Sequence, residues 1–146
     1  MLTKEKLRDT LLTRDNGYRT DLQLVFNTYT NQTVEYLTDK LEETVHRTNQ
    51  KLCRYFLKRP ETRIHFVGFI EEAFNNTHCH CLLKIPSMYD EDEVIRLLAK
   101  YFRQLDTREI PKHTVYRGKK RSDLAFYNVS YTSKGYRCGD DRFIYL

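Results

Sequence analysis

Side-chain character alternates from one position to the next in residues 78–85, near the middle of the chain, a pattern typical of a β-strand. Successive side chains of a β-strand point to opposite faces of a sheet. A strand here places His78 and His80 on one face, and it places Cys79, Cys81 and other apolar residues on the other. The run therefore predicts a strand with one core-facing side and one side that offers two neighbouring imidazoles as a metal-ligand pair.

The same run reads His-Cys-His-Cys, which raises the alternative of a zinc knuckle. A zinc site needs ligands that converge on one ion, whereas alternation sends cysteines and histidines to opposite faces. The four cysteines form no CxxC pair, and Cys79 and Cys81 are poorly placed to bridge along one strand. We therefore expect reduced thiols and a reducing, cytoplasmic compartment.

Hydrophobic spacing predicts two long helices. Residues 31–57 have apolar side chains at three-and-four spacing, with Asn31 or Thr33 as a cap and Pro60 as a stop. A helix over 90–105 begins with acidic residues that complement the helix dipole, so we interpret them as structural. The other expected elements are a short helix over 3–12, strands over 21–29, 63–72 and 113–117, a helix over 122–134 and an edge strand over 143–146.

The order of these elements predicts an α+β fold in a single domain, residues 1–146, with residues 1–20 as an N-terminal arm. The strands over 63–72 and 78–85 are expected to form a hairpin. The order β-α-β-β-α-β predicts a central antiparallel sheet with a ferredoxin-like or RRM-like core and helices packed on one face. The other face is left for the histidines, and a tyrosine-bearing helix over 122–134 follows.

The composition favours a nucleic-acid partner. Lys and Arg number 25 against 20 Asp and Glu, and the formal charge of +5 favours polyanions. No apolar run reaches membrane-spanning length and the N-terminus is not signal-like, so we expect no membrane association. The chain has no GxxxxGK[ST] motif, which excludes a P-loop nucleotide motor within it.

A second group of residues lies on the last predicted helix. Tyr127 and Tyr131 are four residues apart and Lys134 is three further on, so two phenols and an ammonium share one side of the helix. Tyrosines at this spacing are common in cores and interfaces. The pattern gains specificity only in combination with the histidine pair.

His78-Cys79-His80 followed by Tyr131-Thr132-Ser133-Lys134 resembles the second and third motifs of the HUH endonucleases, most closely those of rolling-circle replication initiator (Rep) proteins. Tyr127 is similar to the partner tyrosine of two-tyrosine initiators, and residues 24–28 (LVFNT) are a counterpart of the first motif. The resemblance covers residues 21–135. Cysteines at positions 79 and 81 depart from the usual pattern.

The resemblance implies metal-dependent, sequence-specific nicking and rejoining of single-stranded DNA at the origin of a plasmid or virus, through a 5′-phosphotyrosine. Tyr131 would attack, Lys134 would stabilise the phenolate or hold the phosphate, and Tyr127 would act as a second nucleophile or pack beneath Tyr131. His78 and His80 would hold Mn²⁺ or Mg²⁺. We also expect a small initiator or isolated nuclease domain that uses a separate or host helicase.

The resemblance implies an acidic or polar third ligand on the neighbouring strand, where Glu71 and Glu72 are the candidates. Adjacent positions face opposite ways, so only one can reach the ion; we favour Glu72 and keep Glu71 as the alternative. Basic residues of the following loop and their neighbours would bind DNA phosphates. These residues are Lys119, Lys120, Arg121, Arg117 and Arg137.

Three other functions compete with this one. A single-tyrosine HUH transposase of a small insertion element has a similar length and a similar His-X-His strand. A non-catalytic RRM-like module has the same β-α-β-β-α-β order, but it displays aromatic residues on its middle strands, where this chain has His78 and His80. A structural viral or phage accessory protein is the third.

Overall fold

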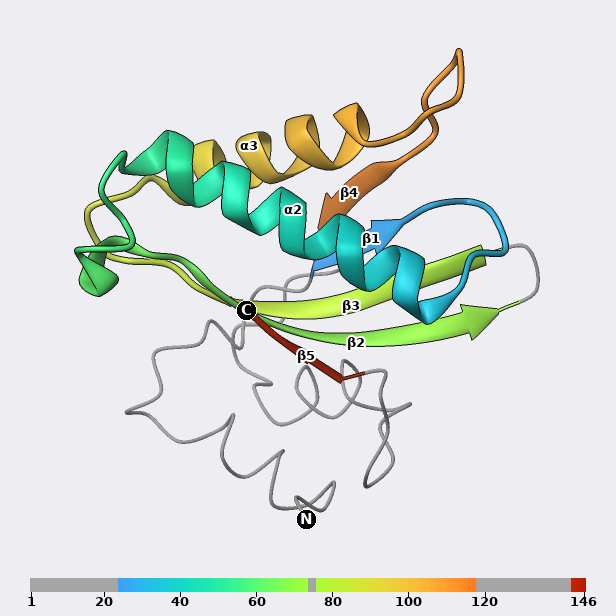
Figure 1. The fold of residues 1–146 in the computed structure, drawn as a ribbon, viewed down its shortest axis with the longest axis horizontal. Coiled ribbons are helices and arrows are strands. Elements are labelled where there is room, and N and C mark those ends of the chain that lie inside the picture. Colours follow the sequence, from blue (N-terminus) through green and yellow to red (C-terminus); the bar gives the residue numbers. More distant parts are fainter. Residues whose placement is uncertain (1–23, 74–75, 118–142) are drawn as a thin grey trace.

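The computed structural model describes residues 24–73, 76–117 and 143–146, which form a layer of two helices on a five-stranded antiparallel sheet (Figure 1). The strand order is β4-β1-β3-β2-β5. The elements are β1 (Leu24–Asn27), α2 (Val34–Leu52), the 3-10 turn η2 (Pro60–Thr62), β2 (His65–Ala73), β3 (Asn76–Lys84), α3 (Glu91–Gln104), β4 (Thr114–Arg117) and β5 (Phe143–Tyr145). The predicted α+β class and antiparallel sheet are confirmed. The expected helices over 3–12 and 122–134 lie outside the described residues.

Helix α2 begins where the sequence predicts and ends earlier. The Thr33 hydroxyl accepts a hydrogen bond from the Tyr36 N–H at 3.0 Å and caps the first turn. The helix ends at Leu52, not at residue 57, because the chain turns back and buries the Phe56 side chain. The Phe56 ring packs edge-on against His46 of α2, with 5.4 Å between centroids. Burial of this ring outweighs the helix propensity of the segment.

The acidic cluster at the start of the second helix is structural, as predicted. The Asp90 carboxylate accepts a hydrogen bond from the Glu93 N–H at 3.1 Å and caps α3. Glu93 in turn pairs with Arg96 one turn later. These contacts give Asp90 and Glu93, two of the four acidic residues at the start of α3, a structural role.

The core lies between the two helices and one face of the sheet. Phe26 of β1 packs edge-to-face against Phe66 of β2, at 5.6 Å between centroids, and against Phe102 of α3, at 5.2 Å. Gly68 is required beneath this cluster, because a Cβ there would lie 2.5 Å from Phe66 Cε1 and 2.7 Å from Cys79 Sγ. The other core residues are Leu24, Leu37, Leu41, Val45, Ile64, Ile70, Cys81, Leu83, Val94, Leu98 and Ile144.

The second face of the sheet is not open along its whole length, which corrects the expectation that it stays free for the histidines. Val67, Phe69 and Leu82 point to this face, and each is at most 2% exposed. Polar residues replace the apolar ones toward the hairpin end of β2 and β3. The histidine side of the sheet is therefore apolar and buried in its middle and polar at one end.

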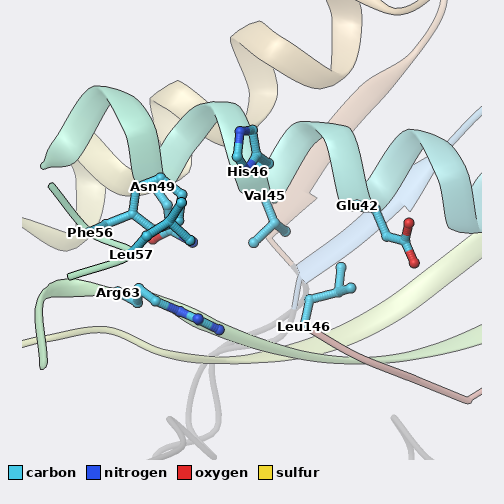
Figure 2. A pocket seen from close by; sticks show the side chains of 8 residues that line it. All are labelled: Glu42, Val45, His46, Asn49, Phe56, Leu57, Arg63 and Leu146. Carbon is cyan, nitrogen blue, oxygen red and sulfur yellow. The ribbon is translucent and has the colours of Figure 1, made fainter. Parts of the chain in front are cut away.

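A hollow of about 210 Å³ lies on the helix side of the sheet, between α2 and the start of β2 (Figure 2). Its walls include Val45, Phe56 and Leu146, with the guanidinium of Arg63 at one side. Arg63 precedes β2, whereas the histidines lie beside the far end of that strand. The hollow therefore belongs to a different part of the molecule from the histidine pair.

Candidate metal centre

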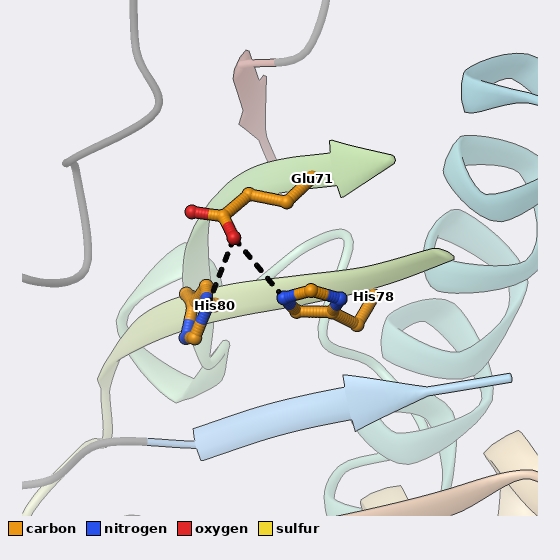
Figure 3. A group of neighbouring side chains, drawn as sticks. All are labelled: Glu71, His78 and His80. Carbon is orange, nitrogen blue, oxygen red and sulfur yellow. Dashed lines mark ion pairs between the residues drawn. The ribbon is translucent and has the colours of Figure 1, made fainter. Parts of the chain in front are cut away.

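Three side chains that can ligate a metal converge at the hairpin end of β2 and β3 (Figure 3). The strand register places Glu71 directly opposite His78, and Phe69 opposite His80. Directly opposed residues of an antiparallel pair project from the same face. Glu71, His78 and His80 therefore share one face, and we call these three residues the triad.

One carboxylate oxygen lies close to both imidazoles. Glu71 Oε2 is 3.2 Å from His78 Nε2 and 3.7 Å from His80 Nε2, and the ligand atoms of the triad all lie within 4.8 Å of one another. Bonds of about 2.0–2.2 Å from a metal ion to nitrogen and oxygen place neighbouring ligands roughly 3.0–3.5 Å apart. The triad therefore needs only small shifts to surround a cation.

A backbone contact fixes which nitrogen of His78 can ligate. His78 Nδ1 lies 3.1 Å from the carbonyl oxygen of Asn76. Only a protonated nitrogen can bond to a carbonyl oxygen, so the neutral ring presents its lone pair at Nε2, toward Glu71. Such a second contact is usual for a metal-ligating histidine, because it fixes the tautomer and the ring orientation.

The donor set and its enclosure suit a reactive metal site. Side-chain exposure is 23% for Glu71, 13% for His78 and 9% for His80, so the ligands are largely withdrawn from water. Two imidazoles and one carboxylate carry a single negative charge and leave coordination positions for a substrate oxygen. A site of this kind can act as a Lewis acid on a carbonyl or phosphoryl oxygen.

The preference for Glu72 as the third ligand is not supported, and the structure favours the alternative, Glu71. Glu72 pairs with Thr77, so it falls on the other face of the hairpin from the histidines, and it is exposed to solvent. The sequence could not decide between the two, because the register depends on where the turn begins. The pairing of Ala73 with Asn76 sets it.

The two cysteines of the run point away from the triad, as alternation predicts. Cys79 and Cys81 are fully buried in the core beneath the helices. Burial raises the pKa of both thiols well above the ordinary value, so they stay protonated. Because the thiols and the imidazoles project from opposite faces of the strand, the four side chains of a His-Cys-His-Cys zinc site do not converge on one ion here.

A network of hydrogen bonds fixes the end of the sheet that carries the triad. The Thr28 hydroxyl donates to the Thr77 carbonyl at 2.9 Å, and the Thr77 N–H donates to the Thr30 carbonyl at 2.8 Å. Arg108 donates to the Thr28 carbonyl at 3.1 Å and is itself held by the Asp106 carboxylate. The Arg108 bond holds the pKa of Asp106 well below its usual range. Thr77, the residue before His78, is thus held by hydrogen bonds at both its N–H and its carbonyl oxygen.

The strand register shows that two more residues lie at the polar end of the sheet, next to the triad. Neither was assigned to the site from the sequence. Asn27 of β1 lies opposite His78, and Thr114 of β4 lies opposite Asn27. Asn27 is only 3% exposed. The only sequence signal for Asn27 was its place at the end of a predicted strand, in the counterpart of the first motif.

The predicted nucleophiles and most of the predicted DNA-binding residues lie outside the described residues. These residues are Tyr127, Tyr131, Lys134, Lys119, Lys120, Arg121 and Arg137. The backbone of Arg117 is described, and it pairs with Leu24 at the end of β4.

Comparisons of the chain with protein-family models, with curated proteins and with solved structures found no match. Within the part of the chain that the structure describes, no helix is long and apolar enough to cross a membrane. The triad and the sequence motifs are therefore the features that indicate a function.

Proposed function

We propose that this protein is a metal-dependent endonuclease of the HUH type that nicks and rejoins single-stranded DNA, as a rolling-circle replication initiator does. The observation that carries the proposal is the convergence of Glu71, His78 and His80 on one face of the sheet. A His-X-His strand with an acidic residue on the neighbouring strand is what the resemblance implied. The sequence motif with Tyr131 and Lys134 supplies the expected nucleophile and charge.

The arrangement of strands supports this assignment. We infer a ferredoxin-like core, because the order β4-β1-β3-β2 is the one produced when each helix connects two parallel strands that flank a third. The RRM-like alternative is disfavoured at the positions that such a module uses. On the middle strands the face opposite the helices carries Val25, Asn27, His78 and His80, where aromatic residues would be expected.

The proposed reaction is a transesterification. A divalent cation, Mn²⁺ or Mg²⁺, held by the triad would polarise the scissile phosphate. The Tyr131 oxygen loses its proton and attacks phosphorus, the bond from phosphorus to the 3′ oxygen breaks, and that oxygen takes a proton to become a free 3′-hydroxyl. The 5′-phosphate remains joined to Tyr131. Reversal by a 3′-hydroxyl rejoins the strand without ATP.

Other residues have supporting roles in this proposal. Lys134 would stabilise the phenolate, whose unperturbed pKa of about 10 makes it scarce at neutral pH. Tyr127 would carry out a second cleavage. Lys119, Lys120, Arg121, Arg117 and Arg137 would bind phosphates. The protein would act in the cytoplasm of a host cell, on the replication origin of a plasmid or virus, together with a separate helicase.

The experiment that tests this proposal is covalent capture. The protein is incubated with single-stranded oligonucleotides of pooled sequence and Mn²⁺, and the products are separated on a denaturing gel. A protein–DNA adduct is expected in wild type, and neither EDTA-treated protein nor Tyr131→Phe should form it. Tyr127→Phe separates one-tyrosine from two-tyrosine chemistry. Absence of any adduct, or an adduct that survives Tyr131→Phe, would overturn the proposal.

The transposase alternative predicts a different oligomeric state. An obligate dimer that shares its tyrosine helix between subunits, and prefers hairpin DNA, would favour the transposase. Adduct formation by a monomer on unstructured DNA favours the initiator. Sedimentation of the protein, alone and with each DNA, distinguishes the two.

A further inference from the structure

A row of polar side chains runs across four strands beside the triad. Glu71 of β2 pairs with His78 of β3, His78 pairs with Asn27 of β1, and Asn27 pairs with Thr114 of β4. All four side chains therefore project from one face. Neighbouring strands are about 4.8 Å apart, so Asn27 lies one strand spacing and Thr114 roughly 10 Å from His78. The row leads from the triad toward the β4 side of the sheet.

The amide of Asn27 has a fixed orientation in this row. Its Oδ1 accepts a hydrogen bond from the Tyr29 N–H at 2.8 Å, which is an Asx-turn between residues two apart. Because an N–H can donate only to the oxygen, the amide nitrogen occupies the other position. The NH₂ group can only donate hydrogen bonds, so it suits an anionic or carbonyl oxygen placed next to His78.

Tyr29 has an unusual backbone conformation at the end of this row. Its φ is 54°, the only positive φ among the described residues other than glycine. The left-handed region costs a residue with a Cβ roughly 1–2 kcal/mol. The ring is nevertheless exposed to 48%, and its hydroxyl lies 3.2 Å from the hydroxyl of Thr114. The strained backbone thus holds a large aromatic ring in water, tied to the outer end of the polar row.

We propose that Asn27 and Tyr29 form a nucleotide subsite beside the triad. The Asn27 amide donates a hydrogen bond to a phosphate oxygen of single-stranded DNA, and the Tyr29 ring stacks on the base of a neighbouring nucleotide. Base stacking on an aromatic side chain requires an exposed ring held in place, and the bond to Thr114 provides this. The inference rests on the proposed function, because it takes the DNA to be the strand held at the triad.

The backbone strain at Tyr29 provides a sharp test. Glycine adopts a positive φ without steric cost, so Tyr29→Gly should keep or raise the melting temperature. The same change removes the stacking surface and should weaken binding of a fluorescein-labelled pool of single-stranded oligonucleotides by about 5- to 150-fold. Fluorescence anisotropy in EDTA measures this affinity without metal or cleavage. A purely structural role for Tyr29 predicts no loss of affinity.

Two further variants complete the test. Tyr29→Phe keeps the ring and should retain most of the affinity. Tyr55→Ala is the matched control, because Tyr55 is 56% exposed and follows α2, away from the triad; it should bind as wild type. Asn27→Asp keeps the oxygen that accepts from Tyr29 but replaces the donor by a carboxylate, so it should weaken binding while the fold is retained.

The outcomes separate this inference from the proposed function. If wild type forms the covalent adduct but Tyr29→Gly binds DNA as tightly as wild type, or no more weakly than Tyr55→Ala, the subsite is wrong and the nuclease stands. Absence of single-stranded DNA binding by wild type would also contradict the subsite. Mn²⁺ affinity of Tyr29→Gly should equal that of wild type, which shows that a loss of DNA binding is not a loss of the metal.

Discussion

The two faces of strand β3, which has nine residues, lie in opposite environments. Toward the helices lie Cys79, Cys81 and Leu83, each at 0% exposure and packed among aromatic rings. On the opposite face, His78 and His80 lie beside a carboxylate. Changes on the helix face should therefore alter stability and leave ligand affinity intact, whereas changes to the triad should do the reverse.

The largest effect on stability is expected from Leu83→Ala. The side chain is fully buried, and its removal leaves a cavity, so the free energy of unfolding should fall by about 2–5 kcal/mol. Urea denaturation followed by circular dichroism measures this. The folded fraction should bind Mn²⁺ with wild-type affinity; a matching loss of affinity would show that the two faces are not independent.

Gly68→Ala should have the next largest effect. The added Cβ meets Phe66 and Cys79 at distances that force the ring or the sulfur to move, and overpacking of this kind costs about 1–3 kcal/mol. Thermal unfolding of wild type and variant measures the difference. An unchanged melting temperature would contradict the close approach between β2 and β3.

Acidification should destabilise the helix side through His113. This residue is 2% exposed, and its ring stacks on that of Phe102 with 4.9 Å between the centroids. Burial lowers the pKa of His113. The unfolded chain then binds a proton that the folded chain resists. The contribution of neutral His113 to the free energy of unfolding is fully present above the pKa of about 6.5 that histidine has in the unfolded chain. The free energy of unfolding falls as the pH decreases below this value, by at most about 1.4 kcal/mol per pH unit for one proton.

The pH effect can be assigned by substitution. His113→Phe keeps a ring next to Phe102 and removes the titrating group, so the slope of stability between pH 6.5 and 5 should decrease. At lower pH, protonation of Asp106 should destabilise both proteins, because the Arg108 bond depresses the pKa of that carboxyl. An identical slope in the two proteins would assign the acid sensitivity to other groups.

Thiol labelling is the mildest of these tests, because it reports the burial of cysteines on the helix face of β3 and does not change the stability of the fold. In a Cys138→Ser background, Cys53 is partly exposed and should react with a disulfide reagent in the native state. Cys79 and Cys81 are buried, and burial raises the pKa of both thiols. They should react only after unfolding. Rapid native labelling of either would place it outside the core.

Local patterns predicted where α2 begins and the division of β3 into two faces. Thr33, one of the two candidate caps, caps α2, because capping depends on neighbours within one turn. The alternation along residues 78–85 placed the histidines on one face for the same reason. These features depend on residues close in sequence, so they can be predicted from a single amino-acid sequence.

The hairpin and the antiparallel sheet were predicted, but the exact register of the paired strands was not. A shift of one residue in the hairpin register exchanges the faces of Glu71 and Glu72, and no local pattern sets that register. The early end of α2 depends on the return of Phe56 to pack against that helix. The left-handed backbone of Tyr29 was also not predicted, although the contact beside it is local: the Tyr29 N–H donates to the Asn27 side chain two residues earlier.

Isothermal titration calorimetry of Mn²⁺ binding to wild type and two matched variants tests the metal centre itself. Glu71→Gln and Glu72→Gln remove the same charge at adjacent positions, but only Glu71 lies in the triad. Wild type should bind one Mn²⁺, Glu71→Gln should weaken that binding by at least about tenfold, and Glu72→Gln should leave it within twofold. Loss of binding in Glu72→Gln with wild-type affinity in Glu71→Gln, or no binding by wild type, would contradict the metal centre.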